Sequence, residues 1–200
     1  MMAFFGKNKI LSKDEIEKLG QAIIYIAKNT PNLSKTKILK LIYLMDEISI
    51  KKYGIPIFNI NYKVWQAGPV NVELFSTLSD GEGILIEKYF EVSNDLNGYI
   101  KPKVEFSDDE FTENEMGILN LVIESFGAKT AFELVDICHK RDSLWYKISF
   151  ENGLLEAFEN KQITSTDYTI DFSEYLGDVS LQNRYKDYTE FVQLSREFKN

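Results

Sequence analysis

The adjacent residues Cys138 and His139 are the first place in the sequence where a nucleophile and a base could act together. Both fall in the run AFELVDICHK, whose apolar spacing predicts a helix, and consecutive helical residues point about 100° apart. A thiol is activated only by a base within hydrogen-bond reach. We therefore expect Cys138 to be a small core residue. We expect His139 to lie near the helix C-terminus, where partial positive charge complements the helix dipole.

The remaining polar pairs give no catalytic or metal-binding pattern. Asp46 and Glu47 are consecutive on a predicted helix, so they do not share a face and do not form a general acid–base pair. A single cysteine and a single histidine among scattered acids do not make a ligand set for a transition metal. The sequence has no phosphate-binding loop and no dinucleotide-type glycine pattern. We predict no catalytic residue, no metal and no cofactor, and we do not expect an enzyme.

The charge of the chain is unevenly distributed around its net value of −8. Residues 1–63 carry eleven lysines against five acids, whereas residues 64–200 carry twelve bases against twenty-six acids. An acidic chain binds phosphate backbones poorly, so we expect no strong nucleic-acid binding. A transcriptional regulator remains an alternative because of the basic residues on and beyond the second predicted helix. These are Lys35, Lys37, Lys40, Lys51 and Lys52, of which the first three are expected to lie largely off its apolar stripe.

Capping signals predict two helices in the first third of the chain. Ser12 begins a capping box, and the helix that follows stops before Pro31. Ser34 caps a second helix, which ends at Tyr53 with Gly54 in the C-terminal capping position.

The run NINYKVWQAGPV alternates well enough to predict a short strand that turns at Gly68-Pro69. In this interpretation Trp65 faces the core, so truncating it would cost about 3–5 kcal/mol. Gln66 and Ala67 are expected at the rim of the corner, where they could contact a partner. Asn71 is expected to cap a short helix that Gly81 closes.

The fold class expected is mainly α (α+β), with a small antiparallel sheet inserted after the third helix. The β-like runs ILIEKYFEV and YIKPKVEF, joined by a turn at Asn97-Gly98, supply this sheet. Residues 1–200 are expected to form a single domain with a core at about 12–150, and residues 151–200 a helical extension of the same body. Thr112 and Thr130 begin two further capping boxes. The sequence shows no signal peptide and no membrane span, so we expect a cytoplasmic protein.

Two ordered blocks of the sequence resemble the Panacea domain family, which includes SocA-like antitoxins and GepA-like phage-associated proteins. The blocks span roughly residues 20–150. Ala67 departs from the pattern, since many members carry Tyr there, and the segment after 150 has no positional match. The matching positions are Leu41, Tyr43, Asp46, Tyr53, Gly54, Trp65, Gly68, Pro69 and Val70 in the first block, and Ala131, Glu133, Leu134, His139 and Trp145 in the second.

The resemblance implies an antitoxin that neutralises a companion toxin by direct protein contact, without fixing the class of toxin. An alternative is an adaptor that delivers the toxin to a cytoplasmic protease. A phage-associated or transcriptional regulator is a further alternative. The family-signature residues have structural or partner-binding roles in this view. The expected partner surface comprises Gln66, Ala67, Asp108, Asp109 and Glu110, because an acidic surface can cover the basic site of a toxin.

Overall fold

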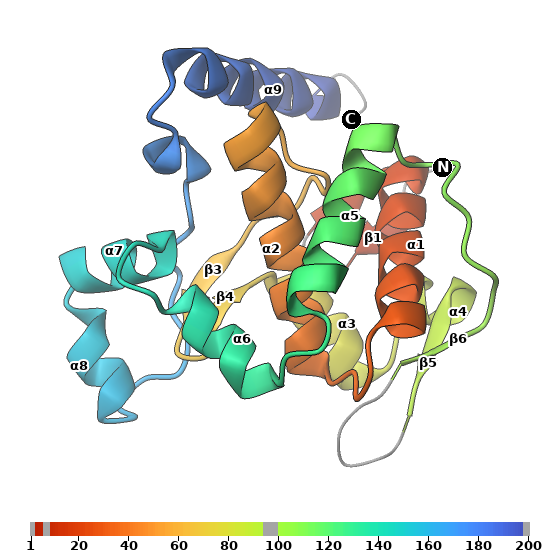
Figure 1. Ribbon diagram of the computed structural model, residues 1–200, viewed down its shortest axis with the longest axis horizontal. Helices are drawn as coiled ribbons and strands as arrows, with labels where there is room; N and C mark the ends of the chain where they lie inside the picture. Colours follow the sequence, from red (N-terminus) through yellow and green to blue (C-terminus); the bar gives the residue numbers. More distant parts are fainter. Residues whose placement is uncertain (1–2, 6–8, 94–99, 198–200) are drawn as a thin grey trace.

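Helix α2 (Lys35–Tyr53) lies at the centre of the molecule, with other helices around it (Figure 1). The computed structural model describes residues 3–5, 9–93 and 100–197. Within these residues, α2 packs against α1 (Lys13–Asn29), α3 (Val72–Asp80), α5 (Glu113–Phe126) and α6 (Ala131–Cys138). Every residue from 37 to 47 is buried. A helix that is enclosed on all sides belongs to the core rather than to the surface.

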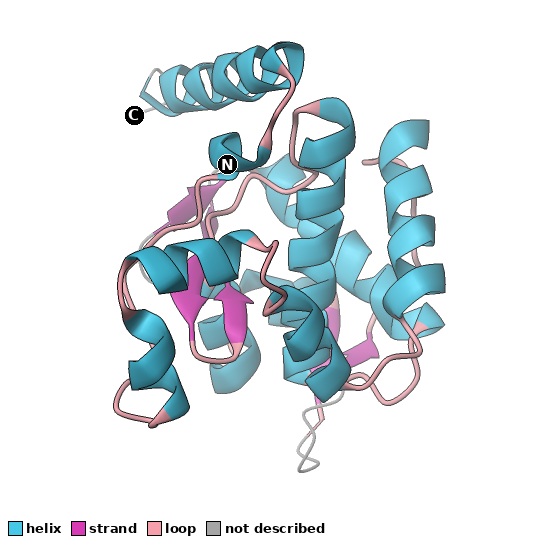
Figure 2. Cartoon of the chain, turned by 60° about the vertical axis from the view of Figure 1, so that its left-hand side comes forward, coloured by secondary structure: helices cyan, strands magenta, loops and turns pink. Residues whose placement is uncertain are grey.

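Short elements complete the fold around α2. The described part of the chain contains three antiparallel two-stranded sheets, β1–β2, β3–β4 and β5–β6 (Figure 2). The mainly helical fold class with small antiparallel hairpins is thus confirmed. The remaining elements are β1 (Ala3–Phe5), β2 (Lys9–Leu11), β3 (Lys63–Trp65), β4 (Gly68–Val70), α4 (Ile84–Lys88), β5 (Phe90–Val92), β6 (Ile100–Pro102), α7 (Leu144–Glu151), α8 (Leu154–Glu159), the 3₁₀ turn η1 (Phe172–Tyr175) and α9 (Val179–Glu197).

The helix boundaries follow the capping residues that the sequence predicts. Ser12, Thr112 and Thr130 each take part in a complete capping box at the start of α1, α5 and α6. The side chains of Ser34 and Asn71 accept hydrogen bonds from the first turns of α2 and α3. These contacts satisfy amide groups that have no partner within the helix, and they fix where each helix begins.

The corner around Trp65 turns at a different place from the one predicted. Gly68 and Pro69 lie in strand β4, where Gly68 pairs with Trp65 and Pro69 pairs with Val64. The turn is therefore the two-residue loop Gln66-Ala67, and the prediction of a turn at Gly68-Pro69 is wrong. Gly68 has φ +95°, a conformation that L side chains rarely adopt, so glycine is required there by the strand itself.

The run ILIEKYFEV is only partly a strand. Its first five residues form α4, which follows Gly83, and only Phe90–Val92 forms β5. Leu85 is fully buried, and both neighbouring isoleucines pack against the core, so helical packing overrides the β propensity of this segment. The second predicted strand, YIKPKVEF, is confirmed only over Ile100–Pro102, which forms β6. The predicted turn at Asn97-Gly98 lies outside the described residues.

The last fifty residues contain α8, η1 and α9, and between them an extended segment that the sequence did not indicate. Residues 164–170 run antiparallel along β3. The backbone amides of Val64 and Gln66 donate to carbonyls of this segment at 2.9 and 3.0 Å, and the amide of Ile170 donates to Tyr62 at 2.9 Å. The hairpin therefore has its outer edge covered by the chain itself.

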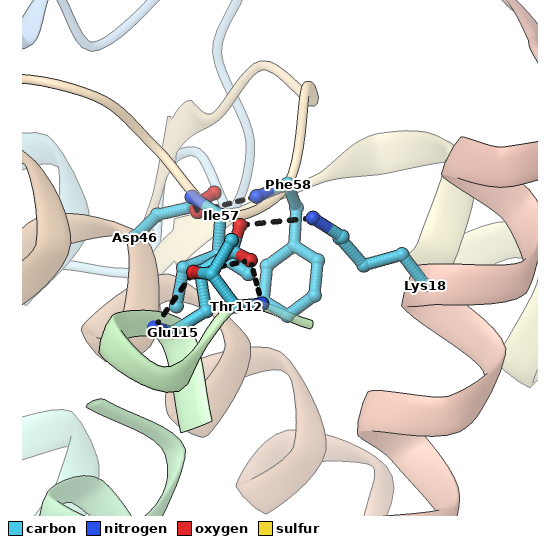
Figure 3. A network of polar contacts seen from close by, with 6 residues as sticks. All are labelled: Lys18, Asp46, Ile57, Phe58, Thr112 and Glu115. Carbon is cyan, nitrogen blue, oxygen red and sulfur yellow. Dashed lines mark hydrogen bonds and ion pairs between the residues drawn. The ribbon is translucent and has the colours of Figure 1, made fainter. Parts of the chain in front are cut away.

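Asp46 holds the loop between α2 and β3 from inside the core (Figure 3). Its side chain is completely buried, and Oδ1 accepts hydrogen bonds from the backbone amides of Ile57 and Phe58 at 2.8 Å each. The hydroxyl of Tyr62 donates to Oδ2 at 2.7 Å. A buried carboxylate needs such donors, and here they fix the path of the chain from α2 into β3.

Helices α1 and α5 are joined through the cap of α5 (Figure 3). Glu115 accepts a hydrogen bond from the amide of Thr112 at 2.8 Å, which completes the capping box. The second oxygen of the same carboxylate accepts a hydrogen bond from the ammonium of Lys18 at 2.9 Å and forms an ion pair with it. One carboxylate therefore both starts α5 and sets its position against α1.

Replacing Asp46 with alanine should destabilise the fold by about 3–5 kcal/mol, because three buried donors lose their acceptor at once. The isosteric change Asp46→Asn should cost less, since the amide oxygen can still accept from the backbone. Urea unfolding followed by circular dichroism measures both. The exposed Asp187 on α9 is the matched control, and Asp187→Ala should stay within about 0.5 kcal/mol. Equal stabilities for Asp46→Ala and Asp187→Ala would contradict this account of Asp46.

Candidate functional site

The β3–β4 hairpin is bound to three helices by side-chain hydrogen bonds to or from its corner. From α2, the ammonium of Lys40 donates to the carbonyl oxygen of Pro69 at 2.7 Å. From α7, Nε1 of Trp145 donates to the carbonyl oxygen of Trp65 at 2.7 Å. The hairpin in turn donates from Nε2 of Gln66 to the carbonyl oxygen of Phe158 in α8, at 2.6 Å. The family-signature residues of the two sequence blocks therefore meet at this corner.

Lys40 is buried in the centre of the corner, with only 1% of its surface exposed. A Cβ placed on Gly68 would lie 3.1 Å from Nζ of Lys40 and 3.4 Å from Cβ of Cys138. Lys40 and Cys138 therefore leave little room for a side chain at this position. Burial lowers the pKa of Lys40 from 10.5 to about 8. Lys40 was not among the site residues that the sequence analysis identified.

The expectation that Lys37 and Lys40 lie off the apolar stripe is wrong. Lys37 is also buried, and its ammonium donates to the carbonyl oxygens of Pro31 at 2.8 Å and Gly127 at 3.1 Å. The available signal was the composition of α2, in which residues 38–45 are apolar except for Lys40 and Tyr43. A helix with no polar face is enclosed, and any lysine within it must bury its stem and find a carbonyl.

Cys138 is a core residue, as predicted, and it is 2% exposed. Burial raises the pKa of its thiol from 9.0 to about 12, although the nearby Lys40 acts in the opposite direction. The thiolate is the reactive form of cysteine, so this side chain is chemically inert near neutral pH.

His139 lies at the C-terminal cap of α6, as predicted, but its charge state differs from the expectation. Its ring stacks on the indole of Trp145, with centroids 3.7 Å apart and planes inclined by 15°. Burial, reinforced by the positive charge of Lys40, lowers the pKa of His139 to about 4. The imidazole is neutral at physiological pH, so the prediction of a partial positive charge at this helix end is wrong.

Trp65 lies at the margin of the core rather than within it. Val64 is fully buried, whereas Trp65, on the opposite side of the strand, is half-buried and packs edge-on against Phe75 with centroids 5.0 Å apart. The prediction that Trp65 faces the core is wrong because the alternation of β3 places its neighbour inward. At the turn itself, Ala67 is exposed and Gln66 is half-buried.

Most other signature residues lie inside the fold or at helix ends. Tyr43 stacks on Phe172 with centroids 5.8 Å apart and meets Tyr62 edge-on. Among the described residues, the Tyr43 hydroxyl has no hydrogen-bond partner. The interior holds Leu41, Tyr43, Asp46, Gly68, Pro69, Val70, Leu134 and Trp145; Tyr53, Ala131 and His139 are half-buried; Gly54 and Glu133 take part in helix caps.

The acidic residues expected to face a partner lie in the connection before α5. Asp108 and Asp109 are exposed, and Glu110 is half-buried. No ion pair that the described residues form includes any of the three. The structure does not bring these acids to the β3–β4 corner in direct contact, so the expected surface divides into two separate regions.

A family model described as antitoxin SocA-like, Panacea domain, matches residues 38–146, which is more than half of the chain. This range contains most of α2, the β3–β4 hairpin and helices α5 and α6, and it confirms the family resemblance seen in the sequence. Neither a curated protein nor a solved structure matches the chain. Among the helices of the described residues, none combines the length and the apolar character needed to cross a membrane.

Replacing Lys40 with methionine should remove a pH dependence of stability. The folded protein binds the Lys40 proton less tightly than the unfolded chain does, so burial of the charge opposes folding below pH 8. This cost disappears as the pH rises from about 8 to 10.5, and stability should increase by up to about 3 kcal/mol relative to Lys40→Met. Urea unfolding at pH 7 to 10.5 measures the difference between the two proteins.

The comparison with Lys40→Met is necessary because other groups titrate in the same range. The raised pKa values of Cys138, Tyr43 and Tyr62 make both proteins less stable as the pH rises. The difference between the proteins therefore reports on Lys40 together with its electrostatic interaction with Cys138. Parallel pH profiles would contradict a depressed Lys40 pKa.

The two tryptophans of the corner should differ in their contribution to stability. Trp145→Ala should cost about 3–5 kcal/mol, because it removes a buried indole together with its hydrogen bond. Trp65→Ala should cost about 1–2 kcal/mol, because the side chain is only half-buried. Chemical unfolding of both variants tests the ranking, and a greater loss for Trp65→Ala would reverse it.

Proposed function

Because the chain belongs to the SocA-like antitoxin family, with its Panacea domain at residues 38–146, we propose that it is an antitoxin that neutralises a companion toxin by direct binding. The family match is the observation that carries this proposal. The partner is a protein, and toxin and antitoxin meet in the cytoplasm.

The state of the reactive side chains supports a binding role rather than catalysis. Cys138 is buried with a raised pKa, and His139 is neutral and stacked on Trp145. Such a thiol and imidazole do not form the thiolate–imidazolium pair that a cysteine nucleophile needs. Asp46 is occupied by donors from its own chain. We therefore propose a protein that acts by contact and not as an enzyme.

The distribution of charge supports a basic protein partner over a nucleic acid. Two of the lysines on which a nucleic-acid interface would depend, Lys37 and Lys40, are buried and donate to backbone carbonyls. The acids of residues 64–200 exceed the bases by fourteen. Such a chain repels phosphates and attracts basic surfaces.

Co-expression with the product of the neighbouring reading frame tests the proposal. The neighbour alone should arrest growth, the wild-type antitoxin should restore growth, and the two proteins should co-purify. Asp46→Ala serves as the control with a destabilised fold and should not restore growth. A neighbour without toxicity, or a toxin that is neither bound nor neutralised, would refute the antitoxin function.

The same experiment in a host lacking cytoplasmic ATP-dependent proteases separates blocking from adaptor activity. A blocking antitoxin restores growth equally well in both hosts, with the toxin level unchanged. Rescue that disappears in the protease-deficient host, with toxin accumulating, would establish the adaptor mechanism instead.

A further inference from the structure

Helix α5 exposes one long side that no other described element covers. Ile118, Leu119 and Val122 face inward, and the helix packs against α1 and α2. In Figure 1, α5 runs down the front of the molecule. We define the outer face of α5 as Glu113, Gly117, Leu121 and Glu124, which are all exposed and share one side of the helix by their spacing.

Gly117 is unfavourable for α5 itself. A helix is less stable with glycine than with alanine in its interior, so another requirement must account for glycine at this position. Its φ is not positive, and a Cβ added at this position would meet nothing within 4 Å. Neither backbone conformation nor internal packing therefore requires glycine here. What the glycine provides is a flat stretch of backbone beside Leu121, whose side chain is 43% exposed.

The surroundings of this face are strongly acidic. Residues 105–126 contain seven acids and no lysine or arginine. Two of the acids are neutralised, since Glu105 pairs with Lys28 and Glu115 pairs with Lys18. The other five take part in no ion pair of the described residues: Asp108, Asp109, Glu110, Glu113 and Glu124.

We propose that the outer face of α5 is the docking site for a basic helix of the toxin. The toxin helix crosses α5 at Gly117, where the missing side chain allows close approach, and an apolar residue packs on Leu121. Its lysines and arginines reach Glu113, Glu124 and the acids that precede α5. This surface identifies the binding site for the antitoxin function proposed above and rests on that function.

The first test fills the flat stretch without adding charge. Gly117→Gln should raise the melting temperature or leave it unchanged, because glutamine is the better helix former and has open space. It should weaken binding of the purified toxin encoded by the neighbouring frame at least tenfold, measured by calorimetry. The control is Asn183→Gln on the exposed side of α9, which should bind as wild type does. A lowered melting temperature for Gly117→Gln would mean that the glycine serves the fold itself, which overturns the inference.

The second test reverses the charge of the same face. Glu113→Lys with Glu124→Lys should also weaken toxin binding at least tenfold, and most strongly at low salt. The matched control is Glu156→Lys with Glu159→Lys on α8, which makes the same change in net charge at two exposed positions. Equal losses in both pairs would indicate a general effect of net charge and would overturn the assignment to α5.

The outcomes separate this inference from the proposed function. If the wild-type protein binds the toxin and both α5 variants bind equally well, the antitoxin function stands and the docking site is wrong. If the wild-type protein neither binds nor neutralises the toxin, the antitoxin function fails, and the docking site fails with it. Selective loss in the α5 variants, with their folds intact, supports both.

Discussion

The structure depends on one constraint, which is that α2 is enclosed along most of its length. A helix in this position gains stability from the apolar area that it buries, but the charged groups buried on it need partners inside the protein. Asp46 accepts hydrogen bonds from two backbone amides and a tyrosine hydroxyl, and Lys40 donates a hydrogen bond to the carbonyl oxygen of Pro69. Because these two residues point in different directions from α2, they fix the chain on two sides of the same helix.

The position of the hairpin follows from this arrangement. Lys40 reaches Pro69 across Gly68, where a side chain would meet the lysine and Cys138. On the other strand, Trp145 donates to Trp65 while His139 stacks on the indole. Burial lowers the pKa of His139 and keeps the imidazole neutral, and the positive charge of Lys40 acts in the same direction. Helices α2, α6 and α7 are thus joined through a short hairpin that would have little stability alone.

The sequence predicted those features that depend on neighbours along the chain. The capping residues Ser12, Ser34 and Thr130 were identified correctly because a helix cap is completed within four residues. The burial of Lys40 depends on elements that are distant in sequence. So does the extended segment of residues 164–170 that runs alongside Val64. The inward direction of Val64 rather than Trp65 follows from the register of a three-residue strand, in which a shift of one position exchanges the two faces.

The family signature and the proposed docking face therefore have different physical roles. Signature residues such as Asp46, Gly68 and Trp145 lie inside the protein, where they determine how the helices and the hairpin fit together. Their burial makes them residues of the scaffold, and the proposed function does not require them to contact the toxin. The choice of partner must instead depend on exposed residues, whose identity the core does not restrict. On α5 this freedom is evident at Gly117, where a Cβ would meet nothing within 4 Å and the sequence supplies none. A scaffold fixed from within and a surface free to vary would allow one fold to serve against chemically different toxins.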